Sequence, residues 1–418
     1  MPTDITKTEA LRLDLSAPQL DVLVTRREDS LIHRDISKQA GNIESLVRGR
    51  RVLVVGGGGS IGSATTQLLV NYGPRSVHVV DHSENYLAEL VRDLRGRPEG
   101  LPDAIDFRAL PIDYGGPVME RLLSESEPYH VVLNFAALKH VRSEKDIYSV
   151  LQMLDTNVVK HIRFKQWLAR GRHGERYFAV STDKAANPTS LMGASKRLME
   201  DLVFEVAAET ANVTTSARFA NVAFSNGSLL QGFRYRLERF QPLAAPRDTK
   251  RYFLSHREAG ELCMLAAFCA PDNHIIFPRM EPQIELQSLE DIAVRVLLAY
   301  GFRPEFFDRE DDARRSVRDL ARSGRWPVLL TPLDTSGEKP YEEFVGEGEV
   351  QINIDLETVA AVRHVTSLAA ADGLFDRIAA AVNNPGSAID KAYIVSIIKN
   401  RLTNFRHVES EKNLDQRL

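Results

Sequence analysis

The sequence has little cysteine, no long apolar run and no excess of either charge. Only two of its 418 residues are cysteine, too few for a disulfide framework or a four-cysteine zinc site. No uninterrupted apolar run approaches the roughly 20 residues that span a bilayer. Lys and Arg number 53 against 57 Asp and Glu, so no basic field attracts nucleic acid or an anionic membrane.

The N-terminus also lacks the charged-then-apolar layout of a signal peptide. We therefore expect a protein of the reducing cytoplasm, with no membrane span and no nucleic-acid partner. Groups of histidines and acids with metal-ligand spacing are missing too, so we expect no metal site.

What the sequence does contain is an alternation of short apolar strands and helical stretches. Strands are predicted at 52–55, 77–81, 105–112, 131–134, 177–181 and 214–219. Their apolar residues are continuous rather than alternating, which is typical of a parallel sheet buried on both faces. The pattern predicts an α/β protein with a Rossmann-type doubly wound parallel sheet and a smaller C-terminal substrate-binding lobe.

We divide the chain into four segments on this pattern. They are an N-terminal arm (1–48), a cofactor-binding Rossmann domain (49–240), a substrate-binding lobe (241–355) and a C-terminal helical extension (356–418). Arms on both sides of the core indicate self-association, so we expect a homo-oligomer.

A glycine-rich loop follows the first predicted strand and precedes a helix, over residues 56–62. Glycines at this turn allow backbone to approach a pyrophosphate closely, and the helix N-terminus supplies free N–H groups. The alternative is a flexible surface loop. We predict that the cofactor contacts are Gly56, Gly59, Ser60, Ile61 and Gly62.

Acidic residues close the next two strands. Asp81 is placed to accept both hydroxyls of an adenosine ribose and to repel a 2′-phosphate. No arginine follows it closely, which favours NAD over NADP. Asp113 is placed to contact the adenine edge, although the role of a helix N-cap fits its position equally well.

Reactive side chains cluster after the fifth strand. Thr182, Asp183 and Lys184 stand at the carboxyl edge, where open sheets of this kind bind ligands. On the next helix Lys196 lies one turn from Met192 and can hold the nicotinamide ribose. Met192 alone is most simply a core residue. Lys139 follows the fourth strand, where a lone lysine is more often solvated than catalytic.

Taken together, these motifs resemble the extended short-chain dehydrogenase/reductase superfamily. The resemblance is to the nucleotide-sugar 4,6-dehydratases related to capsule and flagellin-sugar biosynthesis proteins, and it runs from about residue 49 to 345. Besides the glycine loop, it rests on 134–141 (NFAALKHV), 181–196 (STDKAANPTSLMGASK), 218–222 (RFANV), 251–253 (RYF) and 337–339 (GEK).

The resemblance implies a redox-neutral loss of water from UDP-N-acetylglucosamine, with bound NAD as the hydride carrier. The product is a UDP-4-keto-6-deoxy sugar for surface polysaccharide or glycan biosynthesis. By position, Lys184 is the C5 base, Asp183 is the acid for the departing C6 hydroxyl, and Thr182 binds the C4 oxygen. The resemblance also places Ala136 and Lys196 at the cofactor, and Lys139, Asn221 and Arg251 at the UDP-sugar.

One departure from the superfamily concerns Met192, which stands where most members have a proton-accepting tyrosine. A similar methionine occurs in the branch that retains the C5 configuration, so the resemblance implies a retaining enzyme. Asp183 or a water then takes over the role of the tyrosine.

Two other functions remain open. A nucleotide-sugar 4-epimerase or C4 oxidoreductase would use the same cofactor, but it has no task for Lys184. A non-catalytic NAD-binding protein would have little reason to contain Thr182, Asp183, Lys184 and Lys196 together.

Overall fold

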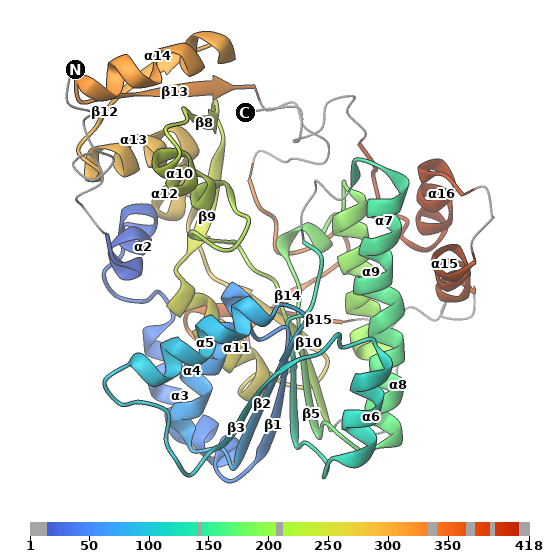
Figure 1. Ribbon diagram of the computed structural model, residues 1–418. Coiled ribbons are helices and arrows are strands. Elements are labelled where there is room, and N and C mark those ends of the chain that lie inside the picture. Colours follow the sequence, from blue (N-terminus) through green and yellow to red (C-terminus); the bar gives the residue numbers. More distant parts are fainter. Residues whose placement is uncertain are drawn as a thin grey trace.

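The molecule is built around a large sheet with helices on both faces (Figure 1). The structure is a computed structural model that describes residues 15–139, 144–205, 212–332, 341–364, 373–384 and 389–408. The sheet has the strand order β14-β15-β10-β6-β5-β4-β1-β2-β3. In chain order these strands are β1 (Arg51–Val55), β2 (Ser76–Asp81), β3 (Asp106–Pro111), β4 (Val131–Asn134), β5 (Arg176–Val180), β6 (Val213–Ala217), β10 (His274–Pro278), β14 (Gln351–Ile352) and β15 (Val359–Arg363).

The strands from β3 to β10 across the sheet are all parallel, which confirms the predicted doubly wound Rossmann-type fold. Among the described strands of this sheet, β15 alone runs in the opposite direction, antiparallel to both of its neighbours, β10 and the edge strand β14. The strand order reverses between β1 and β4. Such a reversal opens a crevice at the carboxyl ends of the strands, where ligands bind in folds of this type.

Both faces of the sheet are covered, and alternate strand residues enter two separate cores. Val52 and Val54 pack in one core, whereas Leu53 and Val55 pack in the other. This is why the strands read as continuous apolar runs. The helices of the first face are α3 (His33–Val47), α4 (Ser60–Leu69), α5 (Glu84–Gly96) and α11 (His256–Phe268), and those of the second are α6 (Pro117–Glu125), α7 (Ile147–Leu154), α8 (Lys160–Arg170) and α9 (Leu191–Glu205). Three short helical segments accompany them: η1 (Val70–Tyr72), η3 (Asp155–Val159) and η4 (Asp183–Ala185).

A smaller lobe with two three-stranded sheets lies at the top of Figure 1. Its hydrophobic core contains the buried Trp326, whose ring centroid lies 4.8 Å from that of Phe302. One sheet contains β7 (Asn221–Val222), β9 (Lys250–Leu254) and β11 (Leu286–Ser288), and the other β8 (Leu243–Pro246), β12 (Arg303–Phe307) and β13 (Arg325–Thr331). The accompanying helices are α10 (Leu229–Glu238), α12 (Pro282–Glu285), α13 (Leu289–Ala299) and α14 (Glu310–Arg322).

The path of the chain differs from the four segments that the sequence indicates. The strands β10, β14 and β15 lie beyond residue 240, yet they extend the large sheet, because α11 and β10 bury their apolar residues in its core. Segments 241–355 and 356–418 therefore both contribute to the main layer. The predicted arm is also packed: α2 (Ala17–Thr25) lies against α13, and α3 lies against α11 with Ile43 and Val47 fully buried.

Two C-terminal helices, α15 (Leu374–Asn383) and α16 (Lys391–Arg401), pack beside α7 and α9 (Figure 1). Within the described parts of the chain, every helix is too short or too polar to cross a membrane.

Candidate active site

The glycine loop between β1 and α4 is closely packed, and four of its glycines, Gly56, Gly57, Gly58 and Gly62, have no room for a side chain. Gly56 has a φ of +70°, and a Cβ added there would lie 2.6 Å from the backbone nitrogen of Ala136. A Cβ on Gly62 would lie 2.5 Å from the carbonyl oxygen of Gly56. Gly59 is the N-cap residue of α4, which begins at Ser60. The unpaired N–H groups of such a helix start attract an anion, so the loop fits a pyrophosphate in both shape and charge.

The carboxylate of Asp81 holds this loop against β2. Its Oδ2 accepts a hydrogen bond from the backbone N–H of Gly58 at 3.0 Å, and its Oδ1 accepts one from Ser83 at 2.9 Å. The side chain is almost fully buried. Each carboxylate oxygen has a further lone pair, which leaves Asp81 able to accept ribose hydroxyls at the edge of the loop.

Asp113 follows β3 and is half-exposed. Its carboxylate accepts hydrogen bonds from Lys160 Nζ at 2.5 Å and from the backbone N–H of Gly115 at 3.0 Å. Burial acts to raise the pKa of Asp113, but these two donors outweigh it and lower the pKa. Asp113 does not cap α6, whose N-cap is Gly116. Its remaining exposed edge is compatible with an adenine contact.

Thr182, Asp183 and Lys184 form one hydrogen-bonded group after β5. The Thr182 hydroxyl donates to Asp183 Oδ1 at 2.8 Å, and Lys184 Nζ lies 3.2 Å from both oxygens of the same carboxylate. Asp183 is nearly buried, whereas the Lys184 side chain is partly exposed. The turn η4 begins at Asp183 with Thr182 as its N-cap, so local backbone geometry brings the three groups together.

Lys196 is buried on α9 beneath this turn. Its Nζ donates to the backbone carbonyl of Val180 at 2.7 Å. Burial lowers the pKa of Lys196 to about 7, although the nearby Glu200 opposes this effect. The amino group of Lys196 therefore lies at Val180, which is the last residue of β5 and directly precedes the segment from Ser181 to Lys184.

A buried network of charges supports the same segment from behind. The Ser181 hydroxyl donates to Glu200 at 2.6 Å, and Glu200 pairs with the fully buried Arg218 at 2.8 Å. Arg218 NH2 also donates to Glu349 at 2.8 Å. Burial acts to raise the pKa of Glu349, but Arg218 and Arg197 prevail and lower the pKa to about 2.

Met192 and Lys139 lie in contrasting surroundings. The Met192 side chain is 2% exposed and packs in the core that α9 forms with α7, α15 and α16. Its thioether itself can neither accept nor donate a proton. Lys139 is exposed after β4. His140 and the motif at 337–339, which the sequence also singles out, lie outside the described residues.

The predicted substrate residues meet around a carboxylate that sequence reasoning missed. Asn221 on β7 and Arg251 on β9 lie on adjacent strands, and the buried Glu342 accepts a hydrogen bond from the Asn221 side chain. Arg251 Nε is 3.5 Å from Glu342 Oε1. Local sequence contains no signal for Glu342, because it reaches the strands from about a hundred residues further along the chain.

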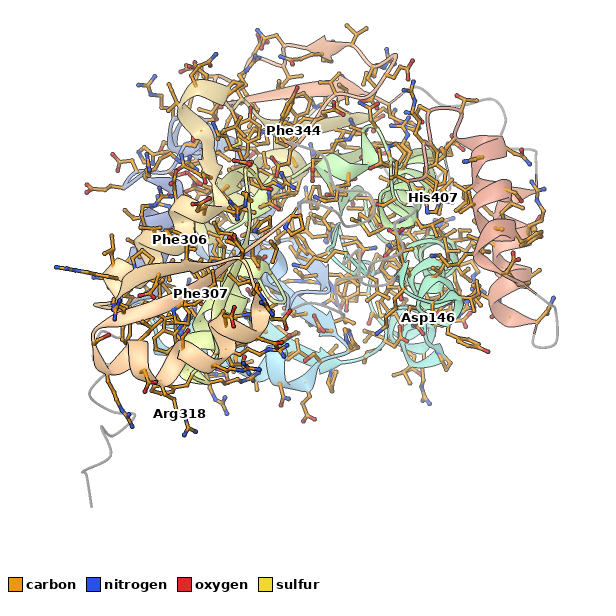
Figure 2. The ribbon with its side chains drawn as sticks, turned by 90° about the horizontal axis from the view of Figure 1, so that it is seen from above. Asp146, Phe306, Phe307, Arg318, Phe344 and His407 are labelled. Atoms are coloured by element: carbon orange, nitrogen blue, oxygen red, sulfur yellow. The ribbon has the colours of Figure 1, made fainter. Side chains whose placement is uncertain are left out.

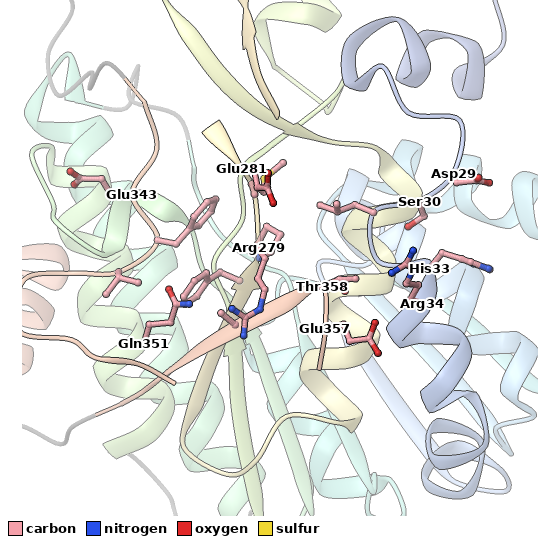
Figure 3. Close-up of a pocket in the computed structure, with 17 residues that line it drawn as sticks. Asp29, Ser30, His33, Arg34, Arg279, Glu281, Glu343, Gln351, Glu357 and Thr358 are labelled. Atoms are coloured by element: carbon pink, nitrogen blue, oxygen red, sulfur yellow. The ribbon is translucent and has the colours of Figure 1, made fainter. Parts of the chain in front are cut away.

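A wide cleft of about 1070 Å³ lies to one side of this group. Figure 3 shows Arg279 near its middle, with Arg34 and Glu357 on one side and Glu343 and Gln351 on the other. Its lining contains none of the predicted catalytic or cofactor residues. The cleft is lined by Glu343, the residue that follows Glu342 in the chain.

Comparisons with known proteins show the family to which the chain belongs and its fold. Residues 52–364 match the family model described as polysaccharide biosynthesis protein. The "Uncharacterized membrane protein MJ1061" of Methanocaldococcus jannaschii is 28% identical over 77% of this chain and 88% of its own length. The "Probable polysaccharide biosynthesis protein EpsC" of Bacillus subtilis is 26% identical over 78% of this chain, which spans about half (50%) of that protein. A "UDP-N-acetylglucosamine 4,6-dehydratase (inverting)" of Campylobacter jejuni is 31% identical over 57% of this chain and 70% of its own length.

Solved structures show the same fold at low sequence identity. Pen from Bacillus thuringiensis superposes with a TM-score of 0.60 at 21% identity, covering 77% of this chain and 92% of Pen. DesIV, a dTDP-glucose 4,6-dehydratase from Streptomyces venezuelae with NAD and TYD bound, has a TM-score of 0.52 at 18% identity, covering 79% and 96%. The family match extends over most of the chain and contains the whole group from the glycine loop to Glu342. The chain therefore belongs to the polysaccharide biosynthesis protein family.

Proposed function

We propose that this protein is an NAD-dependent UDP-N-acetylglucosamine 4,6-dehydratase that retains the C5 configuration. The observation that carries the proposal is the hydrogen-bonded group of Thr182, Asp183 and Lys184 at the carboxyl edge of the sheet. An elimination needs a base and an acid held together, and this group supplies both. It lies at the same carboxyl edge of the sheet as the glycine loop that fits a pyrophosphate.

The residues around the glycine loop fit a dinucleotide. The close backbone approach at Gly56 and Gly62 would accept the pyrophosphate, Asp81 the adenosine ribose and Lys196 the nicotinamide ribose. When bound, NAD+ would take up the C4 hydride and return it to C6.

The chain's own groups would then manage the protons. Thr182 binds the C4 hydroxyl and passes its proton to Asp183, whose Oδ1 is 2.8 Å away. Asp183 gives that proton to the departing C6 hydroxyl, which leaves as water. Lys184, acting as a neutral amine, takes the C5 proton and returns a proton to the same face of C5. Because one group does both, the configuration at C5 is retained.

The position of Met192 supports the retaining reaction. Its sulfur is buried among apolar side chains and cannot accept a proton, so the C4 proton has to leave through Thr182 and Asp183. The Campylobacter jejuni relatives carry the name of inverting enzymes, and Met192 is our reason for proposing the other outcome here. The cytoplasmic location and the homo-oligomer stay predictions of the sequence.

The test is incubation with UDP-N-acetylglucosamine in deuterated water, followed by mass spectrometry and NMR. We expect loss of one water, deuterium at C5 and a retained gluco configuration. Lys184→Ala and Asp183→Asn should each slow turnover by about 10²–10⁴-fold, whereas Lys38→Ala, an exposed lysine on α3, should not. Unchanged substrate contradicts the proposal, and a UDP-N-acetylgalactosamine product without water loss indicates an epimerase.

A further inference from the structure

Glu342 is a buried carboxylate that joins the two strands of the predicted substrate site. Its Oε1 accepts a hydrogen bond from Asn221 Nδ2 and lies 3.5 Å from Arg251 Nε. Its Oε2 accepts the backbone N–H of Tyr252 at 3.1 Å. A carboxylate is suited to this position, because both of its oxygens face donors.

The backbone that carries Glu342 is itself anchored. Phe344, which is labelled in Figure 2, follows two residues later. Its ring stacks on that of Phe277 with centroids 5.6 Å apart and lies 6.1 Å from the ring of Tyr252. The carboxylate therefore projects from a fixed point in the core, and it can restrain the flexible side chain of Arg251.

The charges around Glu342 come from both halves of the site. Burial raises the pKa of Glu342, and the charge of Asp183 adds to this effect, while Arg251 and Lys184 oppose it. Glu342 thus lies within electrostatic reach of the catalytic turn as well as of the strands β7 and β9.

We propose that Glu342 is a positioning residue, which orients Arg251 and Asn221 to receive the diphosphate of the nucleotide sugar. The inference rests on the proposed function, because it takes the ligand to be a UDP-sugar. An arginine side chain loses much rotamer entropy when it is ordered. Because the carboxylate of Glu342 lies against Nε of Arg251, the guanidinium plane is already oriented before the diphosphate binds. Less conformational entropy is then lost on binding, and the affinity for the diphosphate is higher.

The test measures UDP binding by calorimetry on the full chain in the presence of NAD. Glu342→Gln places an amide NH₂ against one of the two donors, so one hydrogen bond and the ion pair are lost. We expect the Kd for UDP to rise about tenfold, a typical effect of losing a hydrogen bond to a charged group. The matched control is Glu343→Gln, the adjacent glutamate, which accepts a hydrogen bond from Asn187 instead; its Kd should be unchanged.

Two further measurements separate positioning from a fault in folding. In turnover, Glu342→Gln should raise KM about tenfold with kcat within about twofold, and NAD affinity should match the wild type. In an Arg251→Ala background, Glu342→Gln should weaken UDP binding by less than about threefold, since only the part of its effect that passes through Asn221 remains.

Three results would overturn the proposal: an unchanged Kd in Glu342→Gln, full additivity with Arg251→Ala, or a wild-type protein that does not bind UDP. If the expected pattern of UDP binding holds but no water is lost from UDP-N-acetylglucosamine, the positioning role stands and the proposed function fails.

Discussion

The cofactor half and the substrate half of the candidate site are held together by different means. The cofactor half is local: the glycine loop, Asp81 and the start of α4 lie within a short stretch of chain and depend on backbone shape. The substrate half joins Arg218, Arg251, Glu342 and Glu349, which are far apart in sequence and depend on buried charges. Steric fit therefore limits change in one half, and charge balance limits change in the other.

The largest effect should come from breaking the buried charge network. Arg218→Met removes the fully buried cation between Glu200 and Glu349 and leaves both carboxylates to Arg197, so we expect the free energy of unfolding to fall by about 3–5 kcal/mol. Urea titration measures it. Arg325→Met, which removes an exposed pair with Glu305, is the control and should cost less than about 1 kcal/mol. Equal losses in both variants would contradict the comparison.

A steric change in the cofactor half should follow in size. The Cβ of Gly62→Ala would lie 2.8 Å from Gly57 Cα, so the loop has to shift and the Kd for NAD should rise about 100-fold, or about 2.7 kcal/mol. Fluorescence titration with NAD measures this. Gly232→Ala, on a helix where an added Cβ meets nothing within 4 Å, should bind NAD normally; normal binding by Gly62→Ala as well would refute the steric argument.

A third prediction concerns a buried lysine, Lys165, to which the described part of the chain brings no carboxylate within ion-pair distance. Lys165 donates to the carbonyl of Val203 at 2.6 Å, and burial lowers its pKa to about 7. The unfolded state has a lysine pKa of about 10.4, so between these pH values it binds more protons and stability rises with pH. Relative to Lys165→Met, the wild type should gain about 1.4 kcal/mol per pH unit from pH 7 to 9. Urea titrations at each pH measure the free energy of unfolding. If it depends on pH in the same way in the wild type and in Lys165→Met, Lys165 is not buried as a neutral amine.

The smallest effect should come from Asp113. Its carboxylate is 49% exposed and its main partner is Lys160, so Asp113→Asn should change the Kd for NAD by less than about threefold, as for other exposed pairs. Asp81→Asn presents an NH₂ to a backbone donor and should weaken NAD binding more than about tenfold. A reversed ranking in NAD titrations would show that the two acids have exchanged roles.

Much of the fold could be predicted because its signals are local. Continuous apolar strands such as 52–55 reveal a sheet covered on both faces, and the six predicted strands all form with ends shifted by only a few residues. The edge strands β14 and β15 were missed as parts of the sheet. β14 has only two residues, β15 runs antiparallel to β10, and both join the sheet from far along the chain, so no local period reveals their place.

The sequence by itself determined the residues that adjoin one another in the chain: the glycine loop with Asp81, and the turn of Thr182, Asp183 and Lys184. Their spacing follows from one strand, one turn and one helix, which local backbone geometry dictates. Only the tertiary structure decided that Glu342 reaches Asn221 and Arg251, that Glu349 completes the shell of Arg218, and that Met192 lies in the core against the C-terminal helices. These contacts join segments that are distant in the sequence. A buried charge is stable only where the fold brings an opposite charge or a hydrogen-bond partner close to it.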